Sequence, residues 1–187
     1  MNNNEKITIK DCIAIAIDIR KSTTLHRKLG TNKSTILIAH FIEECYIEMN
    51  KIKVFNHYIY AGDGIIGVSY TDDNQQAFDK VFNLAQKIKQ IIIKYHTKEE
   101  YFLAGIGIAF DKTNQISVNN LPTQFNNKLF VGDSISISTK VCGSMPLNHN
   151  KYGIKYIGMR DEFVSHLSSK YKKECHKTTT KYVESIA

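Results

Sequence analysis

Two carboxylates, Asp18 and Asp63, stand where apolar runs of the sequence end. Asp63 lies at a Gly-Asp-Gly corner within residues 58–68, and Asp-Gly between two β-rich runs is a strong signal for a tight hairpin. Asp18 follows residues 12–17, an apolar run typical of a buried strand. If these strands pair, both carboxylates meet at one edge of a sheet. Such oxygen ligands suit divalent metal ions and a phosphate-rich substrate.

A candidate phosphate cradle directly follows the first of these strands. It comprises two cations, Arg20 and Lys21, and three small hydroxyl residues, Ser22, Thr23 and Thr24. One of the hydroxyl residues can cap the helix whose pattern begins here. Free amides at a helix start, with two cations beside them, are well suited to bind phosphate.

The remaining apolar patterns predict helices and strands in a definite order. Helical spacing over residues 34–49, and over residues 74–95 after a cap at Asp72 and Asp73, predicts two long amphipathic helices. Strand, helix, hairpin, helix and strand, in that order, is the split β-α-β arrangement of ferredoxin-like α+β domains. In this arrangement the first strand and the central hairpin are neighbours. The strands are expected at residues 12–17, 54–60, 65–70 and 101–110.

The second half of the chain adds one more helix and a C-terminal extension. The helix opens after Gly132 and runs to about Val141, with Asp133 or Ser134 as its cap. The polar segment 112–128 is expected to form a long loop or arm. Shorter elements are expected as strands at residues 116–118, 153–157 and 178–183, and as a helix at residues 160–171.

Composition limits the class of protein. The 187 residues are most simply one domain, covering residues 1–187. A formal charge of +7 suggests an anionic partner, but no nucleic-acid-binding motif accompanies it, so a phosphorylated small molecule is favoured over nucleic acid. Four widely spaced cysteines indicate reduced thiols. Because neither a secretory pattern nor an apolar run of membrane-spanning length is found, we expect a cytoplasmic protein without membrane attachment.

Four short motifs follow one another along residues 13–141. They are residues 16–23, 60–64, 105–108 and 131–140. Together they resemble the class III nucleotidyl cyclases. In that family these positions hold a metal aspartate with a phosphate loop, a hairpin with the second metal aspartate, an Arg-Ile-Gly-Ile strand, and a helix with an asparagine and an arginine. The resemblance implies the ferredoxin-like βαββαβ core of the family, here with a C-terminal extension.

The resemblance also implies a reaction. Asp18 and Asp63 are expected to bridge two Mn²⁺ or Mg²⁺ ions, with the Ile19 carbonyl as a further ligand. Backbone amides of residues 20–23 are expected to hold the β- and γ-phosphates of a nucleoside triphosphate. In the family, two chains packed head to tail complete each site, so a homodimer is expected.

Several positions depart from the family pattern. Ser136 and Lys140 stand where the family has the asparagine and the arginine, and Lys140 is expected to stabilise charge on the α-phosphate as a point charge. Ile59 and Leu129 replace the lysine and aspartate with which adenylyl cyclases read adenine. Gly105 replaces the arginine of the strand motif. The metal site is therefore kept, while the adenine-reading pair is absent.

This short form is similar to the pyrimidine cyclases of the bacterial Pycsar antiphage systems. The similarity implies UTP or CTP as the substrate, cyclic UMP or cyclic CMP as the product, and a separate effector that the product activates. Tyr60 is expected to point towards the base pocket and to contribute to nucleobase preference. No arginine in the sequence clearly matches a partner in that pocket.

Other interpretations are open at this point. Within the same class the alternative is an adenylyl or guanylyl cyclase, and outside it a cyclase-like module that binds nucleotide or a partner without catalysis. A diguanylate cyclase is disfavoured because its longer Gly-Gly-acidic-acidic-Phe signature is missing. Taken alone, Asp63 is an ordinary turn residue, Lys140 a solvated helix residue and Tyr60 a core or rim aromatic. The presence of both metal carboxylates favours catalysis.

Overall fold

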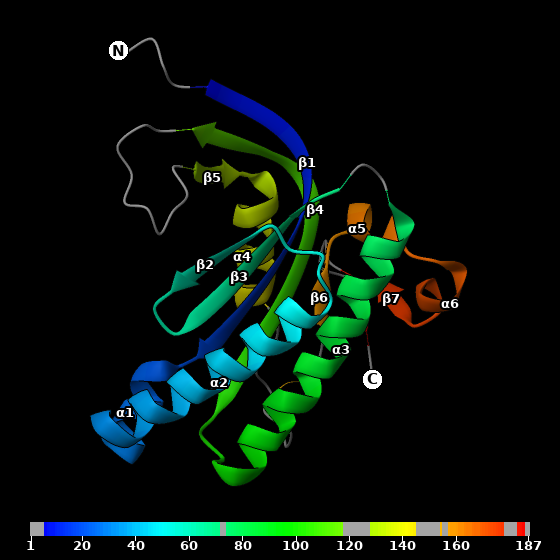
Figure 1. The fold of residues 1–187 in the computed structure, drawn as a ribbon. Coiled ribbons are helices and arrows are strands. Elements are labelled where there is room, and N and C mark those ends of the chain that lie inside the picture. The colour runs from blue at the N-terminus through cyan, green and yellow to red at the C-terminus, as the bar shows by residue number, and fades with distance from the viewer. Residues whose placement is uncertain are drawn as a thin grey trace.

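The computed structural model describes residues 6–71, 74–117, 128–144, 154, 157–177 and 183–185. One mixed sheet with helices on both faces makes up the fold (Figure 1). Among the helices in these ranges, none combines the length and apolarity that a membrane crossing needs. The elements in chain order are β1 (Lys6–Arg20), α1 (Ser22–Leu29), α2 (Thr31–Lys51), β2 (His57–Ala61), β3 (Gly64–Tyr70), α3 (Gln75–Lys98), β4 (Leu103–Ser117), β5 (Lys128–Gly132), α4 (Asp133–Ser144), β6 (Ile157–Met159), α5 (Asp161–Ser165), α6 (Ser169–Lys172), β7 (Cys175–Lys177) and β8 (Val183–Ser185).

β1 lies inside the sheet, flanked by antiparallel partners. It pairs with β3 on one side and β4 on the other, and the strands run in the order β2-β3-β1-β4-β6-β8-β7, with β5 paired to the far end of β4. Alternating isoleucine and alanine make β1 apolar on both faces, as a strand covered by helices on both sides requires. The order β2-β3-β1-β4 confirms the predicted ferredoxin-like α+β core, and β6, β7 and β8 form the C-terminal extension.

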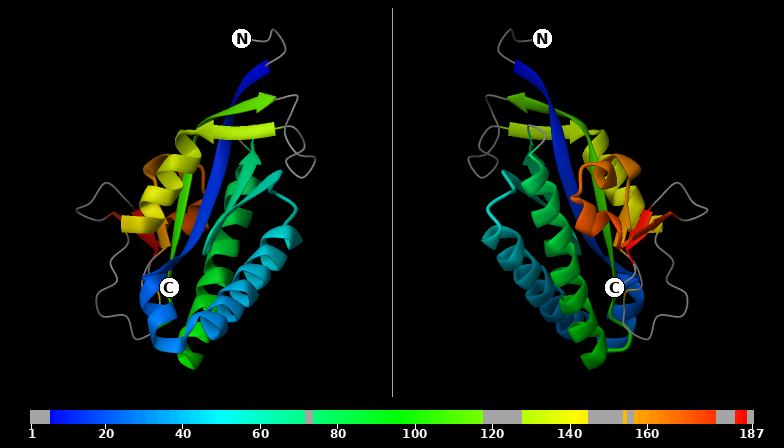
Figure 2. Two further views of the ribbon diagram at one scale, coloured as in Figure 1. Left: turned by 90° about the vertical axis from the view of Figure 1, so that its left-hand side faces the viewer. Right: turned by 90° about the vertical axis from the view of Figure 1, so that its right-hand side faces the viewer.

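The main core lies between the sheet and the helices α2 and α3. α2 and α3 cover one face of the sheet (Figure 2). Ile13, Ile15 and Ile17 of β1 are buried in the core that these helices share with the sheet. The apolar residues of α3 recur at helical spacing, so its inner stripe is buried along its length. Asn74 caps α3, because its side chain accepts a hydrogen bond from the amide of Gln76 at 3.0 Å. The predicted cap at residues 72–73 lies outside the described residues.

α4 packs on the opposite face of the sheet and lies very close to β4 (Figure 2). Two glycines of β4 allow this approach. A Cβ built on Gly107 would lie 2.2 Å from the carbonyl oxygen of Ser138 and 2.3 Å from the amide nitrogen of Cys142. A Cβ on Gly105 would lie 2.8 Å from the carbonyl oxygen of Cys142. A side chain at either position would therefore push α4 away from the sheet.

Two strands extend further than the sequence predicts. β1 continues through Asp18 because its pairing with β4 reaches Arg20 opposite Leu103. β4 continues through polar residues to Ser117, since these residues form ladders with both β1 and β5. Strand pairing between distant segments thus overrides the polar composition that predicts a loop. The rest of the predicted arm, residues 118–127, lies outside the described residues.

The predicted helix caps and the C-terminal elements also need correction. Lys21, not a hydroxyl residue, is the N-cap of α1, and no side chain caps that helix. Ser134 lies inside α4, where its hydroxyl bonds that of Thr113, so it is not a cap. Residues 160–171 form the two short helices α5 and α6 rather than one. In the predicted strand 153–157, Ile154 is described and lies in no strand, and Ile157 begins β6. In the predicted strand 178–183, the one described residue is Val183, which begins β8.

We expect Gly107→Ala to lower the free energy of unfolding by about 2 kcal/mol, a typical cost of overpacking. Gly143→Ala in α4 is the matched control, because its added Cβ would make an ordinary 3.5 Å contact with Arg20. Alanine also has a higher helix propensity than glycine, so the control substitution should be neutral or slightly stabilising. Urea unfolding of both variants measures the difference. Equal stabilities would contradict the close packing of α4 on β4.

Candidate active site

Strand pairing brings Asp18, near the end of β1, and Asp63, at the β2–β3 corner, to the same end of the sheet. Asp18 lies opposite Gly64 in the β1–β3 ladder, and the amide of Ile19 donates a hydrogen bond to the carbonyl of Asp63 at 3.3 Å. The corner turns at Gly62, whose φ of 63° is a left-handed conformation that glycine adopts readily. The predicted meeting of these two strands is therefore confirmed.

The charge of Asp63 acts on Asp18. Partial burial raises the pKa of Asp18 above its ordinary value and the negative charge of Asp63 raises it further, whereas the positive charge of Arg20 lowers it. Gly64 leaves room for the carboxylate, since a Cβ there would lie 2.8 Å from Oδ1 of Asp18. Two crowded, partly desolvated carboxylates fit a divalent cation such as Mg²⁺ or Mn²⁺, which prefers oxygen ligands.

The carboxylate pair is a partial ligand set. Within the described ranges, no group of three or more His, Cys, Asp or Glu side chains converges at any point. Metal ions held by Asp18 and Asp63 would therefore need further ligands from backbone carbonyls, water or a bound phosphate. Mg²⁺ in particular is commonly held by one or two carboxylates together with substrate phosphates.

A pocket of about 230 Å³ opens beside the carboxylate edge. The hairpin and β1 form one wall, and α4 forms the other through Thr139 and Cys142. Asp18 and residues of α4 thus line the same pocket. The lining residues are Ala16, Ile17, Asp18, Ala61, Gly64, Ile65, Ile66, Thr139 and Cys142.

Between β1 and α1 the backbone turns in a way that suits an anion. Lys21 adopts a left-handed conformation, with φ 56° and ψ 41°, which is uncommon for a residue other than glycine. The amides of Thr24 and Leu25 both bond to the carbonyl of Lys21, so the amides of Ser22 and Thr23 precede the first helical hydrogen bond. A left-handed residue followed by free helix amides is a known anion-binding arrangement.

Arg20 is not free beside this turn. Its guanidinium donates a hydrogen bond to the carbonyl of Cys142 at 2.9 Å and another to the carbonyl of Gly143. Both carbonyls belong to the last turn of α4, where helix carbonyls lack intrahelical partners and carry partial negative charge. The sequence predicts Arg20 as a cation beside the phosphates, but the structure shows its side chain bound to α4.

Ser136 and Lys140 lie on the exposed face of α4, away from the sheet. At 100° per residue, they fall on the side of the helix opposite its buried residues. One chain therefore does not bring them together with Asp18 and Asp63. The buried residues of α4 are Ser134, Ser138, Val141 and Cys142.

Ile59 and Tyr60 point to opposite faces of β2. Ile59 packs against the small cluster under α4, which includes Ile66 and Cys142. Tyr60 is 60% exposed, and its ring centroid lies 6.4 Å from that of Tyr46 on α2. Ile59 and Tyr60 therefore do not line one pocket, because alternate residues of a strand face opposite sides. A role of Tyr60 in nucleobase preference stays a prediction.

An aromatic wall on the Ile59 face of the sheet was not predicted. The ring of Phe130 in β5 lies 3.9 Å from that of His57 and 5.8 Å from that of Tyr70, centroid to centroid. Leu129, the predicted base-reading position, immediately precedes Phe130 in β5. His57 and Ile59 are two positions apart in β2 and therefore face the same side of the sheet. This periodicity is the sequence signal from which part of the wall could have been predicted.

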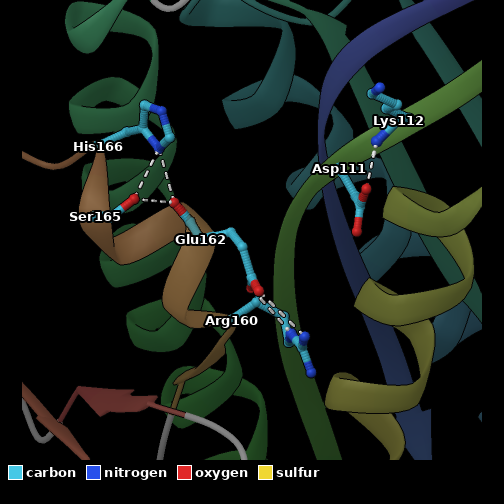
Figure 3. Close-up of polar contacts among 6 residues, drawn as sticks. All are labelled: Asp111, Lys112, Arg160, Glu162, Ser165 and His166. Carbon is cyan, nitrogen blue, oxygen red and sulfur yellow. Dashed lines mark hydrogen bonds and ion pairs between the residues drawn. The ribbon is translucent and has the colours of Figure 1, made fainter.

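A separate polar cluster surrounds α5, beside β4 (Figure 3). Arg160 forms an ion pair with Glu162 at 3.2 Å. The hydroxyl of Ser165 donates to the Glu162 carbonyl, and Nδ1 of His166 lies 2.8 Å from the same oxygen. These contacts join residues close in sequence and brace a short helix, so we assign them no chemistry.

No family model matches the sequence. Two curated relatives, both named uridylate cyclase, are each 26% identical to it. The relative from Treponema porcinum matches over 157 residues, which is 79% of this chain, and the one from Gulbenkiania mobilis over 153 residues, which is 75%. The chain spans 54% of the first relative and 58% of the second, about half their length.

Solved structures match almost the whole chain. The adenylyl cyclase CyaB from P. aeruginosa superposes with a TM-score of 0.72 at 12% identity, covering 97% of this chain and 96% of that one. The chain has the class III nucleotidyl cyclase fold. The monomeric guanylyl cyclase domain of the RhoGC fusion protein from the fungus Blastocladiella emersonii gives a TM-score of 0.70 at 13% identity, covering 96% and 97%. The cyclase fold that the four motifs implied is therefore confirmed.

We expect Asp18→Asn to raise the melting temperature of the metal-free protein at pH 7 by about 2–4 °C, the shift that about 1 kcal/mol produces at this chain length. A carboxyl whose pKa is raised by folding opposes folding once it is ionised, and this cost disappears below its unfolded value of about 3.9. The gain should therefore vanish near pH 3.5. Asp11→Asn, at an exposed position of β1, is the control, and an equal gain there would contradict this account.

Proposed function

We propose that this chain is a pyrimidine nucleotide cyclase that converts UTP or CTP to the 3′,5′-cyclic monophosphate and pyrophosphate. The observation that carries the proposal is the meeting of Asp18 and Asp63 in a class III cyclase fold. A module that only bound a partner would have no need to hold two repelling carboxylates at one edge. The relatives named uridylate cyclase support a pyrimidine substrate.

Asp18 and Asp63 would hold two Mg²⁺ or Mn²⁺ ions, with the Ile19 carbonyl as a further ligand. The Ile19 amide faces Asp63, and the amide and carbonyl of one strand residue point to the same side, so this carbonyl faces the same edge. When bound, such ions lower the pKa of the ribose 3′-hydroxyl and neutralise the triphosphate.

The turn after β1 would bind the triphosphate. Backbone amides at Ser22 and Thr23, with Lys21 beside them, would hold the β- and γ-phosphates. In the reaction the ribose 3′-oxygen attacks the α-phosphorus, and the bond from that phosphorus to the pyrophosphate oxygen breaks. Positioning and charge neutralisation supply most of the catalysis in such transfers.

A second copy of the chain would complete each site. Ser136 and Lys140 face away from their own sheet, so in this proposal they would serve the carboxylates of the other chain. A head-to-tail homodimer then has two equivalent sites, each with Asp18 and Asp63 from one copy and α4 from the other. Lys140 would stabilise the charge that develops on the α-phosphate.

Base preference would come from the face of the sheet that carries Ile59. An isoleucine there offers no hydrogen bond to a purine edge, and the neighbouring rings of His57 and Phe130 offer aromatic contact area. By resemblance, the product would be a second messenger in bacterial antiviral defence and would act on a separate effector. Adenylyl or guanylyl cyclase activity is the alternative that the assay below distinguishes.

We expect the purified protein, incubated with Mn²⁺ and one nucleoside triphosphate at a time, to form a cyclic pyrimidine monophosphate detectable by mass spectrometry. Removal of the metal with EDTA should abolish the product. Asp63→Asn should reduce the rate by at least about a thousandfold, since the bound ions neutralise most of the charge. Asp11→Asn should retain full activity. A cyclic purine product would contradict the pyrimidine assignment, and no product at all would indicate a non-catalytic binding module.

We expect two inactive variants to restore activity when mixed. Asp63→Asn removes the carboxylate half of a site and Lys140→Ala removes the helix half. A mixed dimer then contains one intact site, built from the carboxylates of the Lys140→Ala chain and α4 of the Asp63→Asn chain. Random pairing of equal amounts should return about a quarter of the unmodified activity. Half of the dimers are then mixed, and one of the two active sites in each mixed dimer is intact. Failure to restore activity would overturn the shared site.

A further inference from the structure

We propose that Arg20 is a positioning residue that holds α4 of its own chain in place for the active site completed across the dimer. The inference rests on the proposed function, because α4 takes part in the chemistry only if two copies share each site. Nothing in the cyclase motifs assigns this task to Arg20, which stands in the predicted phosphate loop.

The contact itself is a two-pronged clamp. The guanidinium of Arg20 donates to the carbonyls of Cys142 and Gly143, which are 122 and 123 residues away in the sequence. A planar guanidinium holds its N–H donors in a rigid fork that can meet two neighbouring acceptors in one geometry, whereas the ammonium of a lysine is a compact charge on a flexible stem. A cation at the C-terminal end of a helix is also favoured by the helix dipole. Arg20 thus fixes the last turn of α4 to the end of β1.

A glycine of β4 leaves room for the Cys142 carbonyl that Arg20 binds. Asp18, two residues before Arg20, pairs with Gly105 of β4. A Cβ at Gly105 would lie 2.8 Å from the Cys142 carbonyl, which is the oxygen that Arg20 binds. The absence of a side chain at position 105 therefore lets α4 approach the sheet closely enough for the clamp to form.

The clamp acts close to the exposed catalytic positions of α4. Lys140 lies two residues before Cys142 in the same helix, and Ser136 lies one turn earlier. Because a helix moves as a rigid unit, the direction in which Lys140 projects depends on where the last turn is anchored. A displacement of about 1 Å at a reacting group can cost about a hundredfold in rate. Loss of the clamp should therefore lower turnover more than substrate affinity.

The competing role for Arg20 is to bind a phosphate of the substrate held by its own chain. The two roles place the effect of a mutation in different sites of the dimer. A clamp acts on the site that receives α4, which lies across the dimer. A phosphate ligand acts on the site that contains the carboxylates of its own chain. Mixed dimers with one intact site separate these roles.

The test adds Arg20→Ala to one member of the mixed pair at a time. In the intact site, the Asp63→Asn chain supplies only α4, whereas the Lys140→Ala chain supplies the carboxylates and the phosphate turn. We expect Arg20→Ala in the Asp63→Asn chain to lower kcat by about tenfold to a hundredfold and to change KM by less than about twofold. Arg27→Ala in that same chain, which removes an exposed arginine of α1, should leave both constants unchanged.

Each outcome decides the question. A fall in kcat from Arg20→Ala in the chain that supplies only α4 supports the clamp, and no fall there overturns it. If Arg20→Ala lowers the melting temperature of that chain markedly, Arg20→Lys replaces it, and a smaller fall in kcat is expected because one hydrogen bond can persist. No activity from the parental mixture, with Arg20 intact, would overturn the shared active site itself and with it the clamp.

Discussion

Asp18 and Asp63 repel each other, and the backbone holds them together against that repulsion. The β1–β3 ladder fixes Asp18 opposite Gly64, and the amide of Ile19 binds the carbonyl of Asp63. Burial and the negative charge of Asp63 both raise the pKa of Asp18, so a bound cation would stabilise the ionised carboxylates here. The left-handed corner before Gly64 and the backbone turn after β1 leave the edge open to ligands. Such a cost in stability is expected of the proposed site for metal ions and phosphate.

α4 has two faces with different tasks. Small residues on its inner face, such as Ser138, meet the glycines of β4 and let the helix lie close against the sheet. Ser136 and Lys140 are exposed on its outer face, away from the sheet. In the proposed dimer, assembly would therefore be part of the chemistry, because each chain would contribute half of two different sites.

The parts of the fold that depend on local pattern could be predicted from the sequence. Apolar alternation along β1 and the Gly-Asp-Gly corner suffice to place the carboxylate edge, and helical spacing suffices for α2 and α3. Two of the departures depend on contacts between distant segments. The contact of Arg20 with Cys142 crosses 122 residues, and the extension of β4 comes from ladders with β1 and β5. Tyr60 faces away from Ile59 because side chains alternate along a strand, a local feature that a motif match does not specify.

The close packing at Gly105 limits which substitutions this position can accept. The related cyclase motif has an arginine at this position, and replacing an unusual residue by the family's usual one is a common way to stabilise a protein. Here that replacement would place a long side chain where even a Cβ would lie 2.8 Å from the backbone of α4. An arginine at position 105 would therefore need compensating changes in α4 and at Arg20. The effect of this substitution thus depends on residues around it, a case of epistasis that consensus design would overlook.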